Sequence, residues 1–149
     1  MSEPTYRPAV IGDAADIHAL LLALARDIPL AAETLEQEEA LYAAIRKILA
    51  FGQSWVALDG ETIVGAVLVD SAEVGRHWGE AELLTLRYAG GEMLDGLVGK
   101  VVERNVPVTA SVRDANRTGL AERLLRFGFC ETETRLGERH FRHEPGGPG

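Results

Sequence analysis

Two glutamates at the start of a predicted strand are well placed to move a proton. Glu80 and Glu82 are two residues apart, and alternation along a strand puts both on the same side. A paired environment can raise the proton affinity of one carboxylate, which suits a general base. Solvated carboxylates at a strand end are the alternative interpretation.

Other polar residues carry weaker chemical signals. His77 and Trp78 fall in the loop before that strand, where they either line a pocket or belong to an ordinary surface loop. His140 and His143 are three residues apart, but a metal site needs further ligands in a defined geometry, so we expect no bound metal. The single cysteine, Cys130, has no base beside it and is expected to be a buried structural thiol.

Composition and charge exclude several classes of protein. The 149 residues carry a formal net charge of −8 at pH 7, so we expect no binding to nucleic acid. The longest apolar run, Ala19 to Ala25, is too short to span a bilayer, and the first residues lack a signal pattern. The sequence therefore predicts a cytoplasmic protein that binds no membrane.

Arginines gather late in the chain. They are Arg113, Arg117, Arg123, Arg126, Arg135, Arg139 and Arg142. A solvated face and a site for an anionic ligand are both open interpretations.

The hydrophobic pattern predicts an α/β domain with a mixed sheet and helices on both faces. The strands are expected at 5–10, 54–58, 62–70, 81–89 and 107–112, with another from Phe129 and a possible closing strand at 140–143. Residues 71–79 are expected to form a loop or bulge. The unit from Ala81 to Val112 requires a parallel crossover.

Local signals mark where the elements begin and end. Asp13 is expected to cap the first helix, and Pro29 to end it. Thr34 and Gln37 form a capping box for the second helix. Asp59-Gly60 predicts a tight hairpin.

Two glycines and two polar residues mark the later helices. Gly96 and Gly99 lie inside the third helix, which favours close packing against a neighbour. Thr118 or Asn116 is expected to cap the last helix.

The order β-α-α-β-β-β-α-β-α-β resembles the GNAT superfamily of N-acyltransferases, which use acetyl-CoA or a relative. Three stretches carry the resemblance: 54–65, which ends on Val-Gly; Glu82 to Tyr88, which runs into a glycine-bearing loop; and Val112-x-x-x-Asn116 with the later Gly-Phe of residues 128–129. The resemblance covers nearly the whole chain. The chain length also predicts one domain, which we place at residues 1–143, and the Pro/Gly-rich composition of 144–149 predicts a disordered tail.

The superfamily's architecture assigns residues to the acyl donor. Its fourth and fifth strands splay apart, the pantetheine arm pairs with the fourth strand, and the pyrophosphate binds N–H groups at the start of the third helix. The residues that the resemblance assigns to acetyl-CoA are Leu86, Arg87, Tyr88, Gly90, Gly91 and Asn116.

The resemblance also assigns catalytic roles. Glu82 would deprotonate the amine of a small molecule or peptide, with Glu80 in reserve. Many members carry a tyrosine, five residues before the Phe of Gly-Phe, that protonates the leaving thiolate, and here that position is Leu124. Tyr88 is the substitute acid on the fourth strand.

The phosphate loop departs from the superfamily pattern. The stretch from Tyr88 to Met93 is several residues shorter than usual, and Glu92 adds negative charge where phosphates should lie. Two functions therefore stay open. The first is acetyl-CoA-dependent transfer to a small-molecule amine. The second is a catalytically inactive binding or assembly module, for which a homodimer is one option.

Overall fold

The computed structural model describes residues 5–30, 32–74 and 81–145, and it describes 72–74, 81 and 82 by their backbone alone. The strands are β1 Thr5–Pro8, β2 Trp55–Asp59, β3 Thr62–Val74, β4 Ala81–Gly91, β5 Val108–Arg113, β6 Cys130–Arg135 and β7 Glu138–His143. The helices are the 3-10 turn η1 Ile11–Asp13, α1 Ala14–Ala23, α2 Leu35–Leu49, α3 Leu94–Val102 and α4 Leu120–Arg126. The predicted element order is confirmed, and β7 is the closing strand.

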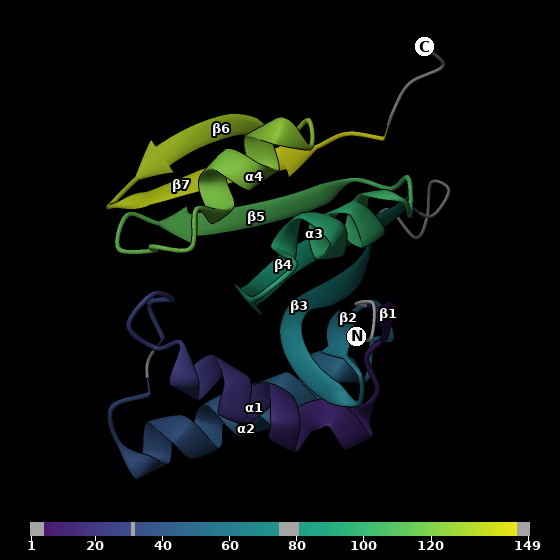
Figure 1. Cartoon of the computed structure of the whole chain (residues 1–149). Coiled ribbons are helices and arrows are strands. Elements are labelled where there is room, and N and C mark those ends of the chain that lie inside the picture. The colour runs from purple at the N-terminus through teal and green to yellow at the C-terminus, as the bar shows by residue number, and fades with distance from the viewer. Residues whose placement is uncertain (1–4, 31, 75–80, 146–149) are drawn as a thin grey trace.

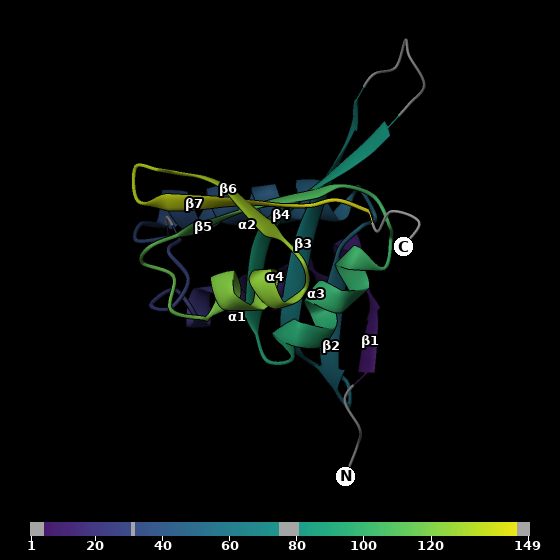
Figure 2. The ribbon, with the colours of Figure 1, turned by 90° about the horizontal axis from the view of Figure 1, so that it is seen from above.

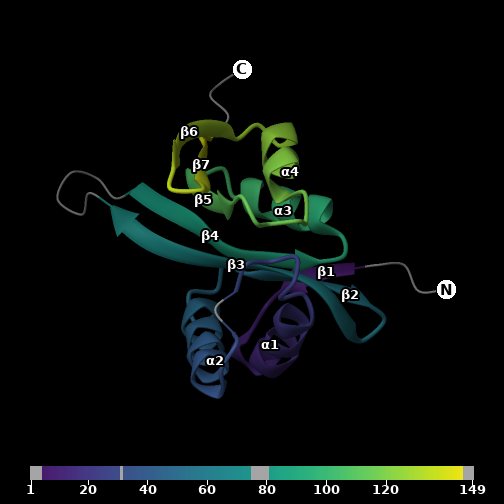
Figure 3. The same cartoon turned by 90° about the vertical axis from the view of Figure 1, so that its left-hand side faces the viewer.

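One mixed sheet connects all the described strands, in the order β1-β2-β3-β4-β5-β7-β6 (Figure 1). Neighbours pair antiparallel except for β4 and β5, which are parallel and joined through α3. Helices α1 and α2 cover one face of the sheet, and α3 and α4 cover the other (Figure 3). The predicted α/β class with helices on both faces is therefore confirmed.

Each face of the sheet has its own hydrophobic core. Ile17, Leu21 and Ile45 are completely buried between the sheet and the helices α1 and α2. Leu97 and Leu124 are completely buried on the face covered by α3 and α4.

Among the helices that the structure describes, none is long and apolar enough to cross a membrane.

Local chemistry explains the best-predicted boundaries. Thr34 caps α2: its hydroxyl accepts the Gln37 N–H at 3.1 Å, and the Gln37 side chain accepts the Thr34 N–H at 3.2 Å. Gly60 adopts a φ of 64° between β2 and β3, which suits the tight turn that Asp59-Gly60 predicts. Gly52 adopts a φ of 74° after α2, as expected of a glycine that follows a helix end.

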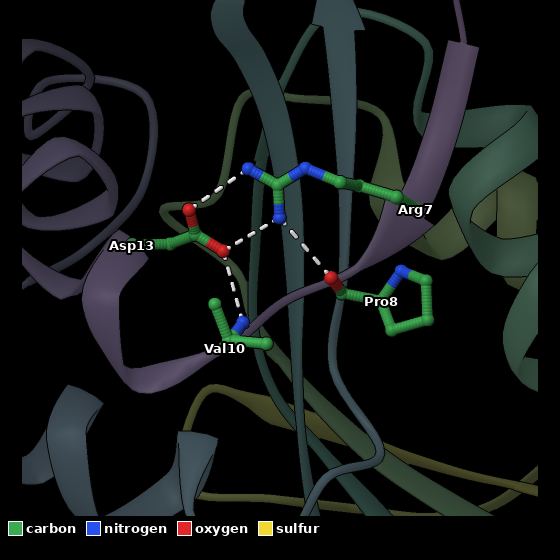
Figure 4. A network of polar contacts seen from close by, with 4 residues as sticks. All are labelled: Arg7, Pro8, Val10 and Asp13. Atoms are coloured by element: carbon green, nitrogen blue, oxygen red, sulfur yellow. Dashed lines mark hydrogen bonds and ion pairs between the residues drawn. The ribbon is translucent and has the colours of Figure 1, made fainter.

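The first helix differs from expectation at both ends. It ends at Ala23, well before Pro29, and turns continue the chain. Asp13 occupies the N-cap position of α1 as expected, but its side chain accepts no hydrogen bond from the helix. Its carboxylate instead forms a two-pronged ion pair with Arg7 of β1, at 2.8 and 2.9 Å, and accepts the Val10 N–H at 2.9 Å (Figure 4). The hydrogen bond from Arg7 holds the pKa of Asp13 below its usual value.

Strand β3 is longer than predicted. It continues through residues 71–74, where a loop or bulge was expected, because these residues pair with the first part of β4. The pair β3 and β4 therefore extends as a ribbon beyond the rest of the sheet (Figure 2). The predicted loop residues His77 and Trp78 lie outside the described residues.

Two predictions at the C-terminal end are wrong. The residue that caps α4 is Gly119, with a φ of 75°, and not Asn116 or Thr118. Cys130 is exposed and not buried. The reason is that β6 is the edge strand of the sheet, and all of its residues are exposed.

Candidate functional site

The site begins where β4 and β5 separate. The two strands pair only from Leu84–Val108 to Leu86–Ala110, although β4 continues to Gly91. Thr85 and Thr109 link them just before they part, with their hydroxyl oxygens 3.2 Å apart. Beyond this link, the edge of β4 that faces β5 pairs with none of the strands that the structure describes, so an extended ligand could pair with it.

A β-bulge explains the separation. Leu68 of β3 pairs with Tyr88, while the next residue, Val69, pairs with Leu86, so Arg87 is an extra residue in β4. A bulge bends its strand and increases the local twist, which turns β4 away from β5. The exposed Arg87 side chain forms an ion pair with Asp70 at 3.5 Å, from Nη1 to Oδ2.

A groove of about 630 Å³ opens at the separation. Its walls come from β4, β5, the segment that follows α1, and α2. The lining residues include Ile28, Pro29, Leu30, Gln37, Leu41, Thr85, Leu86, Arg87, Tyr88, Ala89, Thr109, Ser111, Arg113, Asn116 and Glu138. A volume of this size suits a small-molecule site.

Polar side chains of β5 face the groove. Val108, Ala110 and Val112 are buried in the core beneath α3 and α4, so Thr109, Ser111 and Arg113 point to the opposite face. The Ser111 hydroxyl lies 3.0 Å from Nδ1 of His140 on the neighbouring strand β7. Sequence reasoning missed this contact, because it depends on the register between β5 and β7.

Asn116 lies in the loop after β5 and also lines the groove. Its side-chain oxygen accepts hydrogen bonds from the backbone N–H of Thr118, at 2.9 Å, and from the Thr118 hydroxyl, at 2.6 Å. The oxygen therefore orders the loop. The amide nitrogen of Asn116 is the part of this side chain with donors to offer a ligand.

A very short turn connects β4 to α3. Glu92 and Met93 alone separate the two elements. The Glu92 N–H donates to the carbonyl oxygen of Val64 in β3, at 2.8 Å. A Cβ atom on Gly65 would lie 2.0 Å from the Glu92 carbonyl oxygen. The turn is thus packed tightly onto β3, and the short loop expected from the sequence is confirmed.

Beside this turn lies a second hollow of about 480 Å³. Its lining carries the charged residues Asp27, Glu92 and Arg123. Arg123 pairs with Asp95 in the first turn of α3, at 3.3 Å from Nε to Oδ1, and Arg126 pairs with the same oxygen at 3.1 Å. The start of α3, where the superfamily binds pyrophosphate, therefore already carries a carboxylate of the chain itself.

The structure brings together some of the residues predicted for the site. Leu86, Arg87, Tyr88 and Asn116 all line the groove. Gly91 lines the second hollow. The roles of these residues towards a ligand stay predictions.

Gly90 lies apart from both sets of lining residues. Its Cα faces the side chains of Leu24 and Ile28, where a Cβ would lie 2.4 Å from the Ile28 Cδ1 atom. Residues that follow or end α1 therefore cover the backbone that sequence reasoning assigned to phosphates.

The residues predicted to act as base and acid lie in three different settings. Glu82 lies in β4 opposite Glu73, two residues before β4 meets β5. Glu80 lies outside the described residues. Leu124 is completely buried in α4, so the position of the usual superfamily acid faces the core and not the groove.

Comparisons of sequence and of structure give different results. No family model and no curated protein matches the sequence. Solved structures do match: an agmatine N-acetyltransferase in its apo form has a TM-score of 0.74 at 14% identity, covering 95% of this chain and 99% of that one. A polyamine N-acetyltransferase of Drosophila melanogaster, which forms N-acetylagmatine, has a TM-score of 0.73 at 14% identity, covering 95% and 100%.

A third match contains a bound donor. Arabidopsis thaliana NAA60 in complex with acetyl-CoA has a TM-score of 0.67 at 17% identity, covering 95% of this chain and 98% of that one. The first two neighbours are N-acetyltransferases by name, and the third is bound to acetyl-CoA. This chain has the fold of the GNAT acetyltransferases, as the resemblance predicted.

Acetyl-CoA fits one half of the site better than the other. The open edge of β4 and the groove suit the uncharged pantetheine arm. The turn does not suit a diphosphate, because the Glu92 carboxylate repels it, the Glu92 N–H is already bonded, and Arg123 and Arg126 are already paired with Asp95. The residues of the groove therefore fit the pantetheine thioester, and the residues of the turn do not fit the diphosphate.

Proposed function

We propose that the chain is an N-acyltransferase, which moves an acyl group from a pantetheine thioester such as acetyl-CoA to an amine. The observation that carries this proposal is the separation of β4 from β5 beyond Leu86–Ala110, with the groove opening directly onto it. An extended thioester arm can pair with the free edge of β4 and present its carbonyl carbon to the groove.

The reaction needs few groups from the protein. The neutral acceptor nitrogen attacks the thioester carbonyl carbon, a C–N bond forms and the C–S bond breaks. The thiolate leaves and takes a proton from an acid, which is replaced by the proton that the nitrogen loses as the amide forms. Glu82 is our candidate for the base that takes the ammonium proton, with Glu80 in reserve. Tyr88, which lines the groove, is our candidate for the acid that protonates the thiolate.

We propose a small-molecule amine as the acceptor. The groove has the volume of a small-ligand site. Two structural neighbours are named for agmatine or polyamine acetylation, which supports this class of acceptor. We place the reaction in the cytoplasm, as expected from the sequence.

A turnover assay tests the proposal. The purified protein is incubated with millimolar acetyl-CoA and a panel of amines that includes agmatine, a diamine, an amino acid and a short peptide, and products are detected by mass spectrometry. We expect an acetylated product from at least one small amine. The variant Ser111→Trp fills the groove and should abolish transfer, whereas Thr132→Trp, on the exposed edge strand β6, should not. A lack of product across the panel would contradict the proposal.

A second candidate function is a binding or assembly module without transfer. It is favoured by the buried Leu124 and by the pairing of Asp95 with two arginines at the start of α3. This candidate predicts that no thioester in the assay reacts, and it allows a homodimer, which light scattering would detect. Product formed in proportion to protein concentration would exclude it.

A further inference from the structure

We propose that this site recognises its acyl donor through the pantetheine thioester alone, so that the adenine nucleotide of acetyl-CoA adds little to binding. The transfer step of this inference rests on the proposed function. The inference specifies the donor class: an S-acyl pantetheine, whatever group its far end carries. Three features of the described residues support it.

The first feature is the backbone of the turn between β4 and α3. A phosphate seat needs free N–H groups that converge on one point. The Glu92 N–H is bonded to the Val64 carbonyl oxygen, and the Glu92 carbonyl oxygen packs directly on Gly65. Only Met93 remains between this residue and α3. The turn is therefore held against β3 by this hydrogen bond and this packing, and it is too short to surround a phosphate.

The second feature is the charge around the second hollow. Asp27 and Glu92 line it, and Asp95 lies at the start of α3. Arg123, which also lines the hollow, pairs with Asp95 and donates from Nη1 to the Thr118 carbonyl oxygen at 2.6 Å. Arg126 pairs with Asp95 as well, so both guanidinium groups are already engaged by a carboxylate, while Asp27 and Glu92 have no cation among the residues that line the hollow other than Arg123. A diphosphate would therefore meet three carboxylates and two arginines that are already paired, which opposes its binding.

The third feature is a contact between the groove and the second hollow. The Arg117 N–H donates to the Asp27 carbonyl oxygen at 2.7 Å. Both segments joined by this hydrogen bond run from the hollow to the groove. In the first segment Asp27 borders the hollow and Ile28 borders the groove. In the second segment Thr118 borders the hollow and Asn116 borders the groove. A donor that crosses between these two segments to reach the hollow would compete with this hydrogen bond, whereas a donor that ends in the groove leaves it intact.

Comparing donors tests the inference. The protein is assayed with one accepted amine and with acetyl-CoA, S-acetyl-4′-phosphopantetheine or S-acetylpantetheine, and the released thiol and the acylated amine are both measured. We expect kcat/KM for the three donors to agree within about tenfold. A nucleotide held by two charge-assisted hydrogen bonds would make acetyl-CoA better by about 100-fold or more, and that result would overturn the inference while leaving the proposed function standing.

Binding separates the two claims if no donor reacts. Calorimetry with CoA and with pantetheine needs no turnover. Dissociation constants within about tenfold of each other would support the recognition of pantetheine, even though the proposed function had failed. Binding of CoA that is about 100-fold tighter, or no binding of either compound, would overturn the inference.

A charge reversal gives a further check. Glu92→Lys should raise kcat/KM for acetyl-CoA by about two- to fivefold, the size expected of a solvent-screened charge, and leave S-acetylpantetheine unchanged. Glu39→Lys is the matched control, because Glu39 is exposed on α2 and does not line the groove. An equal rise for both donors, or an equal rise in the control, would contradict the argument from charge.

Discussion

Two glycines in α3 should respond in opposite ways to the same substitution. A Cβ atom on Gly96 would lie 1.9 Å from the Tyr6 hydroxyl oxygen and 2.3 Å from its ring carbon Cζ. A Cβ atom on Gly99 would lie 3.5 Å from the nearest atom of the Phe127 ring, which is ordinary contact. Neither glycine has a positive φ, so alanine suits the backbone at both positions.

The magnitudes follow from two opposing terms. Alanine is favoured over glycine in a helix by about 1 kcal/mol, and this gain applies to both variants. Moving the Tyr6 ring aside should cost about 1–3 kcal/mol, as overpacking usually does. We therefore expect Gly96→Ala to destabilise the protein by about 1 kcal/mol and Gly99→Ala to stabilise it by about the same amount. Their melting temperatures should differ by about 4–8 °C.

Urea unfolding followed by circular dichroism measures both free energies. The double variant Tyr6→Ala/Gly96→Ala isolates the clash, because Gly96→Ala should no longer destabilise once the ring is gone. If Gly96→Ala is as stabilising as Gly99→Ala in the wild-type background, the packing of Tyr6 against α3 is wrong. An unchanged cost in the Tyr6→Ala background would also refute the reasoning.

Two further predictions concern an ion pair and Tyr88, the proposed catalytic acid. Asp13→Asn should reduce the free energy of unfolding at pH 7 by about 1–2 kcal/mol, discounted because the Arg7 side chain is 40% exposed, whereas Asp16→Asn should change little. The pKa of Asp13 is lower in the folded state than in the unfolded state, so the pair contributes its full stability above the unfolded pKa, near 4, and loses it as pH falls through the folded pKa. Urea titrations should therefore show the free energies of unfolding of wild type and Asp13→Asn converging in that acidic range. A difference between the two free energies that persists in acid would contradict this prediction. Tyr88→Phe should lower kcat by about 100-fold with little change in the KM of the donor, measured by steady-state kinetics, and an unchanged kcat would remove Tyr88 as the acid.

Features set by neighbouring residues were the ones that sequence reasoning could find. The capping box of Thr34 and Gln37 and the hairpin at Asp59-Gly60 depend on contacts a few residues apart. Their geometry is fixed by side-chain reach and by the φ that glycine allows. The order of strands and helices then followed, and with it the resemblance that the structural neighbours bear out.

Features that depend on distant partners could not be found in this way. Asp13 is a residue type that often caps helices, but its carboxylate accepts hydrogen bonds from the nearby Arg7 side chain instead. Cys130 begins β6 directly after the buried Phe129, and only the strand order of the sheet reveals that β6 is an edge strand. Alternation predicts which residues of a strand share a face of the sheet, but it does not predict whether that strand lies at an edge or whether another element packs on that face.

The candidate site shows the same division. Leu86, Arg87 and Tyr88 were placed beside the gap through the resemblance, and the bulge at Arg87 brings them to the groove. The contact between Ser111 and His140 and the cover of Ile28 over Gly90 depend on tertiary packing. No spacing in the sequence encodes either of them.

The central claim is that a pantetheine thioester binds in the gap between β4 and β5. Amide chemical shifts, followed by NMR during a titration with S-acetylpantetheine, test it directly. We expect saturable shifts at Leu86, Arg87 and Ser111, which border the separation, and none at Glu131 on the far edge strand. Saturable shifts confined to other parts of the sheet, or no shifts at millimolar ligand, would contradict it.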